Sequence, residues 1–195
     1  WELFEPSKFI YSFFTFNMLY EIDWEETLQT EMISRRKRYT SDKIILLLEF
    51  IYNHLDGRSF ISFYKKYDDK LSIIDNSKSI KPDTNIKKTD KTDFLNKEMP
   101  YLENFKSALK ALNSRDLTIK EHYKLIIFCY QIRNNIFHGE KKAKEMIQSG
   151  QRDRLHNYAQ IILATIEMFF DILKSKYNYI LATEYELKEN AKVSY

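Results

Sequence analysis

The chain has 195 residues, of which 44% are hydrophobic and 30% charged, a composition typical of a globular domain that buries a core. Its 31 basic and 28 acidic side chains leave a net charge of only +3, which excludes a strong overall field for nucleic acid, so any basic surface must be local. Three glycines and three prolines are too few for the turns of a many-stranded barrel or sandwich, and they indicate long helices instead.

The first third of the chain contains three hydrophobic segments that we expect to be helical. Residues 9–24 carry aromatic side chains at steps of three or four, which predicts one helix from about residue 7 to the high twenties. Ser41 and Asp42 are suited to cap a second, strongly hydrophobic helix at 43–55. Residues 59–67 predict a short third helix.

A polar segment, 68–98, separates the two helical halves. It is rich in lysine, aspartate, serine and threonine and contains Pro82, which is typical of a long loop or an insertion. We therefore interpret 1–195 as a single helical domain with an insertion at 68–98, in which residues 99–180 form the core that carries the motif described below.

The second half of the chain predicts a helical hairpin. Pro100 suits the first turn of a helix, and Thr118 can cap the next one, at 119–137. Gly139 is suited to end that helix in the left-handed conformation, and a last long helix is expected to begin near Asp153. The fold class that follows is all-α, a helical bundle.

The apolar face of the predicted helix 119–137 includes Ile126, Cys129, Tyr130 and Phe137. Cys129 is the single cysteine, so an internal disulfide framework is excluded and a reducing compartment is favoured. Its apolar neighbours in the sequence indicate a buried structural thiol and not a nucleophile.

The most apolar runs of the sequence are residues 9–20 and 43–55. Both are shorter than the roughly 20 apolar residues that a membrane-spanning helix requires. The opening residues also lack the basic start and the cleavage pattern of a signal peptide. We therefore expect a cytoplasmic protein without a membrane partner.

The segment QIRNNIFHGEKK, residues 131–142, places three polar residues near the end of its predicted helix. Asn134 and His138 are four residues apart and so lie on one face, and the long side chain of Arg133 can reach the same edge. The partial negative charge of a helix C-terminus favours protonated histidine and moves its titration towards neutral pH. A histidine that takes and gives protons, beside an arginine that binds phosphate, is suited to RNA cleavage.

This pattern resembles the motif of the HEPN superfamily (higher eukaryotes and prokaryotes nucleotide-binding): an arginine, a polar residue and, a few residues on, a histidine near a helix end. Arg133, Asn134 and His138 match it position by position, and the specific similarity covers roughly residues 100–180. The resemblance implies an all-helical bundle and a metal-independent endoribonuclease that cleaves single-stranded RNA. It also implies a homodimer whose motif-bearing helices form one composite site, and a toxin–antitoxin or antiphage setting with an antitoxin or regulatory domain as partner.

Each residue of the motif has an expected role in such an enzyme. His138 would be the general acid and base, Arg133 the stabiliser of the phosphate in the transition state, and Asn134 the group that orients the histidine or the phosphate. The product would be a 2′,3′-cyclic phosphate, because the 2′-hydroxyl nucleophile needs no metal. Lys141 and Lys142 follow directly and are candidates for binding RNA phosphates, although a solvated loop would contain them equally well.

These three residues could also have a purely structural role at the end of the helix, without catalysis. Arg133 would then pair with a carboxylate, Asn134 would satisfy a helix-end carbonyl, and His138 would interact with the helix dipole. The chain would be an inactive HEPN module that binds nucleotide or a protein partner, or a plain helical interaction domain.

Arg152 and His156 miss the family spacing and are expected to be a surface pair or to support the site. No metal-ligand motif or glycine-rich phosphate loop appears, so we expect neither metal nor cofactor.

Overall fold

The computed structural model describes residues 5–22, 43–65, 94–95, 101–137, 146 and 148–176. Within these residues the chain forms helices and no β-strand, which confirms the all-α prediction. The helices are α1 (Glu5–Tyr20), α3 (Lys43–His54), α4 (Gly57–Lys65), α5 (Tyr101–Asn113), α6 (Ile119–Phe137) and α8 (Ser149–Lys176).

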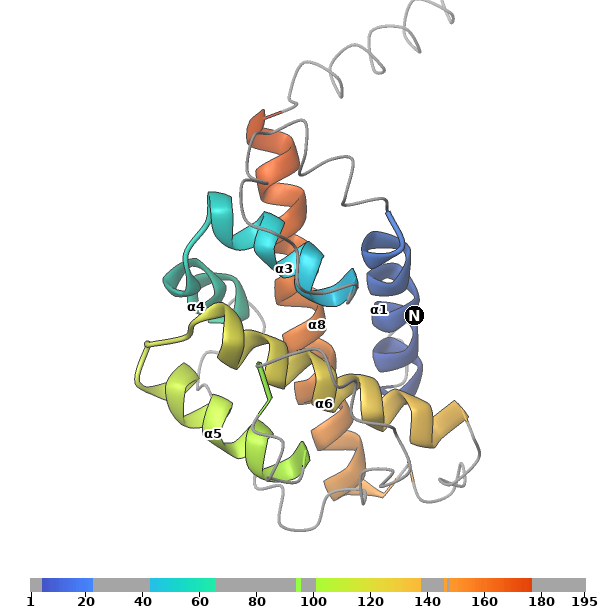
Figure 1. Ribbon diagram of the computed structural model, residues 1–195. Coiled ribbons are helices and arrows are strands. Elements are labelled where there is room, and N and C mark those ends of the chain that lie inside the picture. The colour runs from blue at the N-terminus through green and yellow to red at the C-terminus, as the bar shows by residue number, and fades with distance from the viewer. Residues whose placement is uncertain are drawn as a thin grey trace, which may run out of the picture.

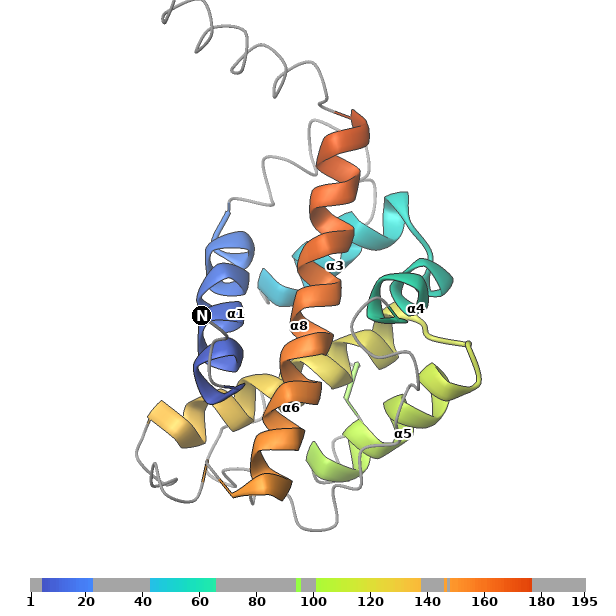
Figure 2. The same ribbon diagram turned by 180° about the vertical axis from the view of Figure 1, so that it is seen from behind.

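Helix α8 is the centre of the bundle (Figures 1 and 2). Helix α1 runs alongside α8 on one side, α3 and α4 cover it on the other, and α6 crosses it with α5 packed beside α6. The side chains of residues 158–162 are all buried, and five consecutive helical positions point in every direction around the axis. A helix segment that is buried all round is one that other helices enclose, which is why this part of α8 occupies the middle.

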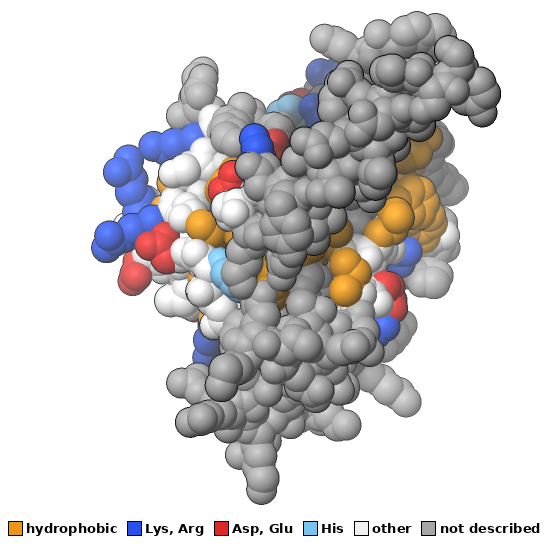
Figure 3. All heavy atoms as spheres, turned by 90° about the horizontal axis from the view of Figure 1, so that it is seen from above, with side chains coloured by type: hydrophobic (Ala, Val, Ile, Leu, Met, Phe, Trp, Pro, Cys, Tyr) orange, Lys and Arg blue, Asp and Glu red, His pale blue; other side chains and the backbone are white. Residues whose placement is uncertain are grey.

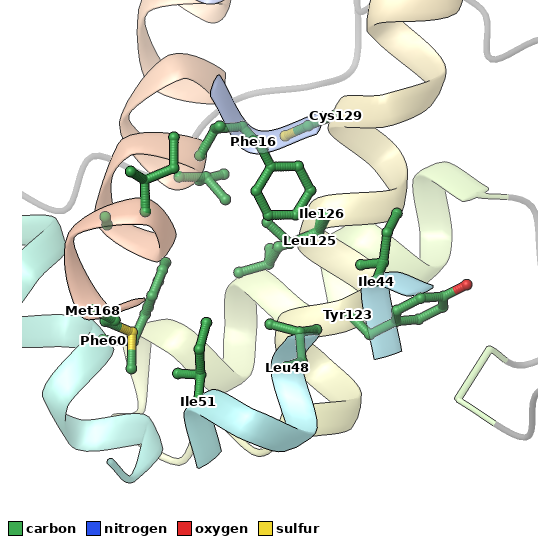
Figure 4. Packing of buried hydrophobic residues seen from close by; sticks show 14 of the residues in the cluster. Phe16, Ile44, Leu48, Ile51, Phe60, Tyr123, Leu125, Ile126, Cys129 and Met168 are labelled. Atoms are coloured by element: carbon green, nitrogen blue, oxygen red, sulfur yellow. The ribbon is translucent and has the colours of Figure 1, made fainter. Parts of the chain in front are cut away.

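The core between these helices is rich in aromatic rings. Phe105 of α5 stacks on Phe128 of α6 with 4.1 Å between ring centroids, and Tyr158 of α8 meets both rings edge-on. A second part of this core, drawn in Figure 4, joins α1, α3, α4, α6 and α8 through a shared set of buried side chains. Its labelled members are Phe16, Ile44, Leu48, Ile51, Phe60, Tyr123, Leu125, Ile126, Cys129 and Met168.

Local hydrogen bonds explain where α4 and α6 begin. Oδ1 of Asp56 accepts the backbone N–H of Arg58 at 2.9 Å and of Ser59 at 3.0 Å, so Asp56 caps α4. Thr118 immediately precedes α6, as predicted, and its hydroxyl bonds the carboxylate of Glu121 three residues on. The N-terminal ends of both helices are therefore specified by residues adjacent to them in the sequence.

The connection from α5 to α6 is held by the backbone. The N–H of Asp116 donates to the carbonyl of Ala111, and the N–H of Arg115 donates to that of Leu112, which is the Schellman pattern of a helix end. Arg115 accordingly has φ of 60°, the left-handed value for which glycine is usual. The connection also touches α4, because a Cβ added at Gly57 would lie 1.7 Å from the carbonyl oxygen of Leu117.

Several predicted boundaries differ from the structure. Helix α1 ends at Tyr20, earlier than the high twenties, because residues 21–22 form a turn after it. Helix α8 begins at Ser149, four residues before Asp153. The proposed insertion at 68–98 lies outside the described residues except for residues 94–95. No helix among the described residues combines the length and the hydrophobicity needed to cross a membrane.

Candidate functional site

The motif predicted from the sequence begins in the last turn of α6, where the structure describes Arg133 and Asn134. The other three predicted site residues, His138, Lys141 and Lys142, lie outside the described residues, as does Gly139. The structure therefore gives the geometry of only two of the five predicted site residues, Arg133 and Asn134.

The side chain of Arg133 is held by three neighbours on its own helix. Its Nη1 donates a hydrogen bond to Oδ1 of Asn134 at 2.9 Å. Its guanidinium carbon lies 4.5 Å from the ring centroid of Phe137 and 5.8 Å from that of Tyr130. Guanidinium groups are attracted to aromatic faces at such distances. The arginine thus reaches the edge of α6 that carries Asn134, as the helix geometry predicts, and two rings support it there.

The positive charge of Arg133 has no anionic partner in the described part of the chain, where no carboxylate lies within ion-pairing distance. Arg152 of α8 differs, because its Nε lies 3.8 Å from the carboxylate of Asp153. The Nε of Arg133 is buried and makes no hydrogen bond there either. A buried donor without a hydrogen-bond partner costs free energy, and here this applies to Nε alone, because Arg133 as a whole is only partly buried. The interpretation in which Arg133 pairs with a carboxylate finds no support among the described residues.

Asn134 orients the arginine in this structure. Its side-chain oxygen accepts the hydrogen bond from Nη1 of Arg133, so it fixes the plane of the guanidinium. The expected role, in which Asn134 orients the histidine or the phosphate, stays a prediction because His138 lies outside the described residues. A neutral amide in this position holds the arginine without cancelling its charge, which a carboxylate would do.

Two further amides of α6 lie on the opposite side of the helix from Arg133. Gln131 and Asn135 are each two residues away from it, which is a rotation of about 200 degrees, and both are buried. Neither the nitrogen nor the oxygen of the Gln131 side chain has a hydrogen-bond partner in the described part of the chain. Sequence reasoning missed these amides, although two amides four residues apart on a core-facing helix edge are a recognisable signal.

Exposed aromatic rings next to Arg133 were also missed. Phe137 was expected on the apolar face of α6 with Ile126 and Cys129, but it is half exposed. It contacts Phe14 of α1, which is half exposed as well. The sequence carried a signal for these exposed rings, because α1 contains more hydrophobic residues than its core-facing side can hold.

The second arginine–histidine pair, Arg152 and His156, makes contacts with neighbours on α8. The ring Nε2 of His156 lies 2.7 Å from the amide nitrogen of Gln160, and Arg152 pairs with Asp153 as described. Arg152 is exposed, whereas His156 is partly buried, so the two residues differ in their surroundings, and their role as a surface pair or as support for the site stays a prediction.

His122 belongs to a buried polar network that connects three helices. The hydroxyl of Thr165 donates to the carbonyl of Ile161 at 2.9 Å, so it accepts from Nε2 of His122 at 2.8 Å. Nδ1 of the ring is then an acceptor, and it lies 3.1 Å from the hydroxyl of Tyr52. Complete burial lowers the pKa of His122 to about 3, which keeps the ring neutral. The network is structural.

Cys129 is buried, and burial raises the pKa of its thiol, so it lacks the thiolate that a nucleophile requires. Among the described residues, no three histidine, cysteine or acidic side chains come together in a group that could hold a metal ion.

Comparison with protein-family models, with curated proteins and with solved structures finds no match to this chain.

Proposed function

We propose that the chain is a HEPN-type endoribonuclease that cleaves single-stranded RNA without a metal ion, at a site built from Arg133, Asn134 and His138. The observation that supports this most is the state of Arg133. Its guanidinium is fixed by Asn134, backed by Phe137, and free of any carboxylate among the described residues. A cation in this condition is pre-oriented to bind an external anion, and the phosphate of RNA is an anion whose geometry the guanidinium group matches.

The hydrogen-bond donors of Arg133 allow it to act on phosphate. Nη1 holds Asn134, while Nη2 makes no hydrogen bond in the described part of the chain and can donate to a phosphate oxygen. During cleavage, negative charge increases on the non-bridging oxygens of the phosphate. A pre-oriented guanidinium stabilises that charge without having to reorganise.

His138 supplies the proton transfers in this proposal. It follows Asn134 by four residues in the sequence, directly after α6. It would remove the proton from a 2′-hydroxyl, whose oxygen then attacks the adjacent phosphorus and expels the 5′-oxygen of the next nucleotide. The products are a 2′,3′-cyclic phosphate and a 5′-hydroxyl, with the leaving oxygen taking up a proton from an acid. Lys141 and Lys142 would bind flanking phosphates.

A homodimer through the motif-bearing helices would bring two copies of Arg133 and His138 to one scissile bond. One histidine would then act as the base and the other as the acid. We place the enzyme in the cytoplasm, where its RNA substrates occur, as the toxin of a toxin–antitoxin pair or as an antiphage effector. An antitoxin or a regulatory domain would restrain it.

The experiment is cleavage of a labelled single-stranded RNA by the purified protein, with and without EDTA. Wild type should cleave in both conditions, and Arg133→Ala and His138→Ala should each lower the rate by at least about 100-fold. Arg152→Ala is the matched control, because it removes an arginine whose charge is already paired. Cleavage that EDTA abolishes, or that survives in both variants, would contradict the proposal.

The alternative is a catalytically inactive HEPN module that binds nucleotide or a protein partner. The half-exposed rings of Phe14 and Phe137 favour a binding surface at this end of α6 whether or not cleavage occurs. Wild-type protein that leaves several RNAs intact but binds them would support this alternative over the enzyme.

A further inference from the structure

A series of exposed aromatic rings leads away from Arg133 across two helices. Tyr11 and Phe14 of α1 and Phe137 of α6 are 56%, 45% and 47% exposed. The ring centroids of Tyr11 and Phe14 are 6.3 Å apart, and those of Phe14 and Phe137 are 5.9 Å apart. Arg133 lies over Phe137 at the inner end of the series. We call these three rings the aromatic ladder.

The aromatic ladder is not needed for the core of the bundle. Helix α1 buries Phe9, Phe13 and Phe16 completely on the side that faces α8 and α6. Tyr11 and Phe14 lie on the outer side of the same helix and remain half exposed. Figure 3 shows hydrophobic side chains gathered at the edge of the molecule where Figure 1 draws α1. Exposed apolar patches of this kind mark binding sites, since folding alone does not require them.

The charges around the aromatic ladder indicate what kind of molecule binds it. Residues 10–20 of α1 contain no charged side chain, and Arg133 is the only charged residue from 125 to 137. The two helix segments therefore present three aromatic rings, one cation and no anion. Single-stranded nucleic acid has the complementary features, because its bases stack on aromatic rings and its phosphates pair with arginine.

We propose that the aromatic ladder is a base-stacking subsite for single-stranded RNA, in which bases stack on Phe137, Phe14 and Tyr11 while Arg133 binds a phosphate next to them. The inference rests on the proposed function, because it adds a substrate-binding subsite to the same site. It extends that function by naming residues of α1, a helix outside the motif, as part of the RNA contact. Stacking accepts any base, so this subsite selects single strands over duplexes and not one sequence over another.

Binding can be measured separately from cleavage with RNA that lacks the nucleophile. The probe is a fluorescein-labelled oligoadenylate of about twelve nucleotides with 2′-O-methyl riboses, whose affinity is read by fluorescence anisotropy. Tyr11→Leu and Phe14→Leu keep the apolar volume but remove the ring face, and each should weaken binding about tenfold. Phe14→Trp should retain wild-type affinity. A second probe of the same length, with abasic residues, retains the phosphates, and wild type and Phe14→Leu should bind it equally.

Phe170→Leu is the matched control, because Phe170 of α8 is a similarly exposed phenylalanine whose ring contact is with Phe169 and not with the ladder. Circular dichroism confirms that each variant is folded. Wild-type affinity in both Tyr11→Leu and Phe14→Leu, or equal weakening in Phe170→Leu, overturns the proposal. So does a result in which Phe14→Glu only converts a dimer to a monomer in light scattering while RNA affinity is unchanged, since the face would then bind a second copy.

The outcome also separates this inference from the proposed function. If wild type cleaves no RNA but binds the methylated probe through Tyr11 and Phe14, the subsite stands and the nuclease assignment fails. If Arg133 and His138 are needed for cleavage but the Tyr11 and Phe14 variants show unchanged affinity and KM, the nuclease stands and the subsite fails.

Discussion

The guanidinium of Arg133 rests on the ring of Phe137, four residues further along α6, with 4.5 Å between the guanidinium carbon and the ring centroid. This contact occupies one side of the arginine, and the hydrogen bond to Asn134 fixes its plane. A long side chain at a helix end normally has several rotamers available. Here the two contacts favour one position of the side chain, and no carboxylate of a described residue neutralises it, so binding an anion costs less conformational entropy.

The charge of Arg133 is the property that Asn134 preserves, and Asn134→Asp tests this. The aspartate has nearly the same shape and would accept the same hydrogen bond, but it would pair with the guanidinium and cancel its charge. We expect RNA cleavage by Asn134→Asp to fall by about tenfold or more, with fold and melting temperature retained. Asn113→Asp, at the exposed end of α5, adds the same charge elsewhere and should cleave like wild type. Full activity in Asn134→Asp would show that the arginine does not need its charge.

The ring of Phe137 should support the arginine more than it supports the fold. Because Phe137 is half exposed, Phe137→Leu should leave the melting temperature almost unchanged. It removes both the cation–π contact with Arg133 and a ring of the aromatic ladder, so kcat/KM for RNA should decrease about tenfold or more. Phe137→Tyr keeps an aromatic face and should keep the activity. Equal losses in the leucine and tyrosine variants would mean that the ring acts by another route.

Protonation of His122 should destabilise the fold at acidic pH. The pKa of the buried ring is about 3, below its ordinary value of 6.5, so the unfolded chain binds the proton first as the pH falls. The stability associated with neutral His122 is complete above pH 6.5 and is lost progressively between 6.5 and 3, with a slope of up to about 1.4 kcal/mol per pH unit. Urea unfolding of wild type and His122→Gln at a series of pH values measures this term. The glutamine variant should show a smaller slope in this range, and identical slopes would rule out His122 as the cause.

Gly57 is required where α4 begins, because no side chain fits between it and Leu117. A Cβ there would lie 1.7 Å from the carbonyl oxygen of Leu117, and backbone atoms cannot move aside as a flexible side chain does. We expect Gly57→Ala to lower the free energy of unfolding by about 3 kcal/mol, measured by urea denaturation. Gly150→Ala is the control, since a Cβ at Gly150 meets nothing within 4 Å. That variant lies in the first turn of α8 and should be as stable as wild type or slightly more stable. A wild-type unfolding midpoint for Gly57→Ala would contradict this packing.

The sequence alone determined that the chain is helical, roughly where the helices lie, and which side chains on several of them are buried. The three- or four-residue spacing of Phe9, Phe13 and Phe16 predicted the buried face of α1, and all three are buried. Thr118 predicted the start of α6, and the apolar neighbours of Cys129 predicted its burial. These features depend on side chains within a turn or two of each other, and such local preferences are visible in a linear pattern.

Only the tertiary structure decided which residues meet at the candidate site. The pairing of Phe14 with Phe137 joins residues from opposite halves of the chain. The finding that no carboxylate of a described residue pairs with Arg133 likewise depends on how the helices pack, and not on the motif itself. Packing and solvation are sums over neighbours that are distant in the sequence. The charge of Arg133 therefore follows from its residue type, while the finding that it has no anionic partner among the described residues required the fold.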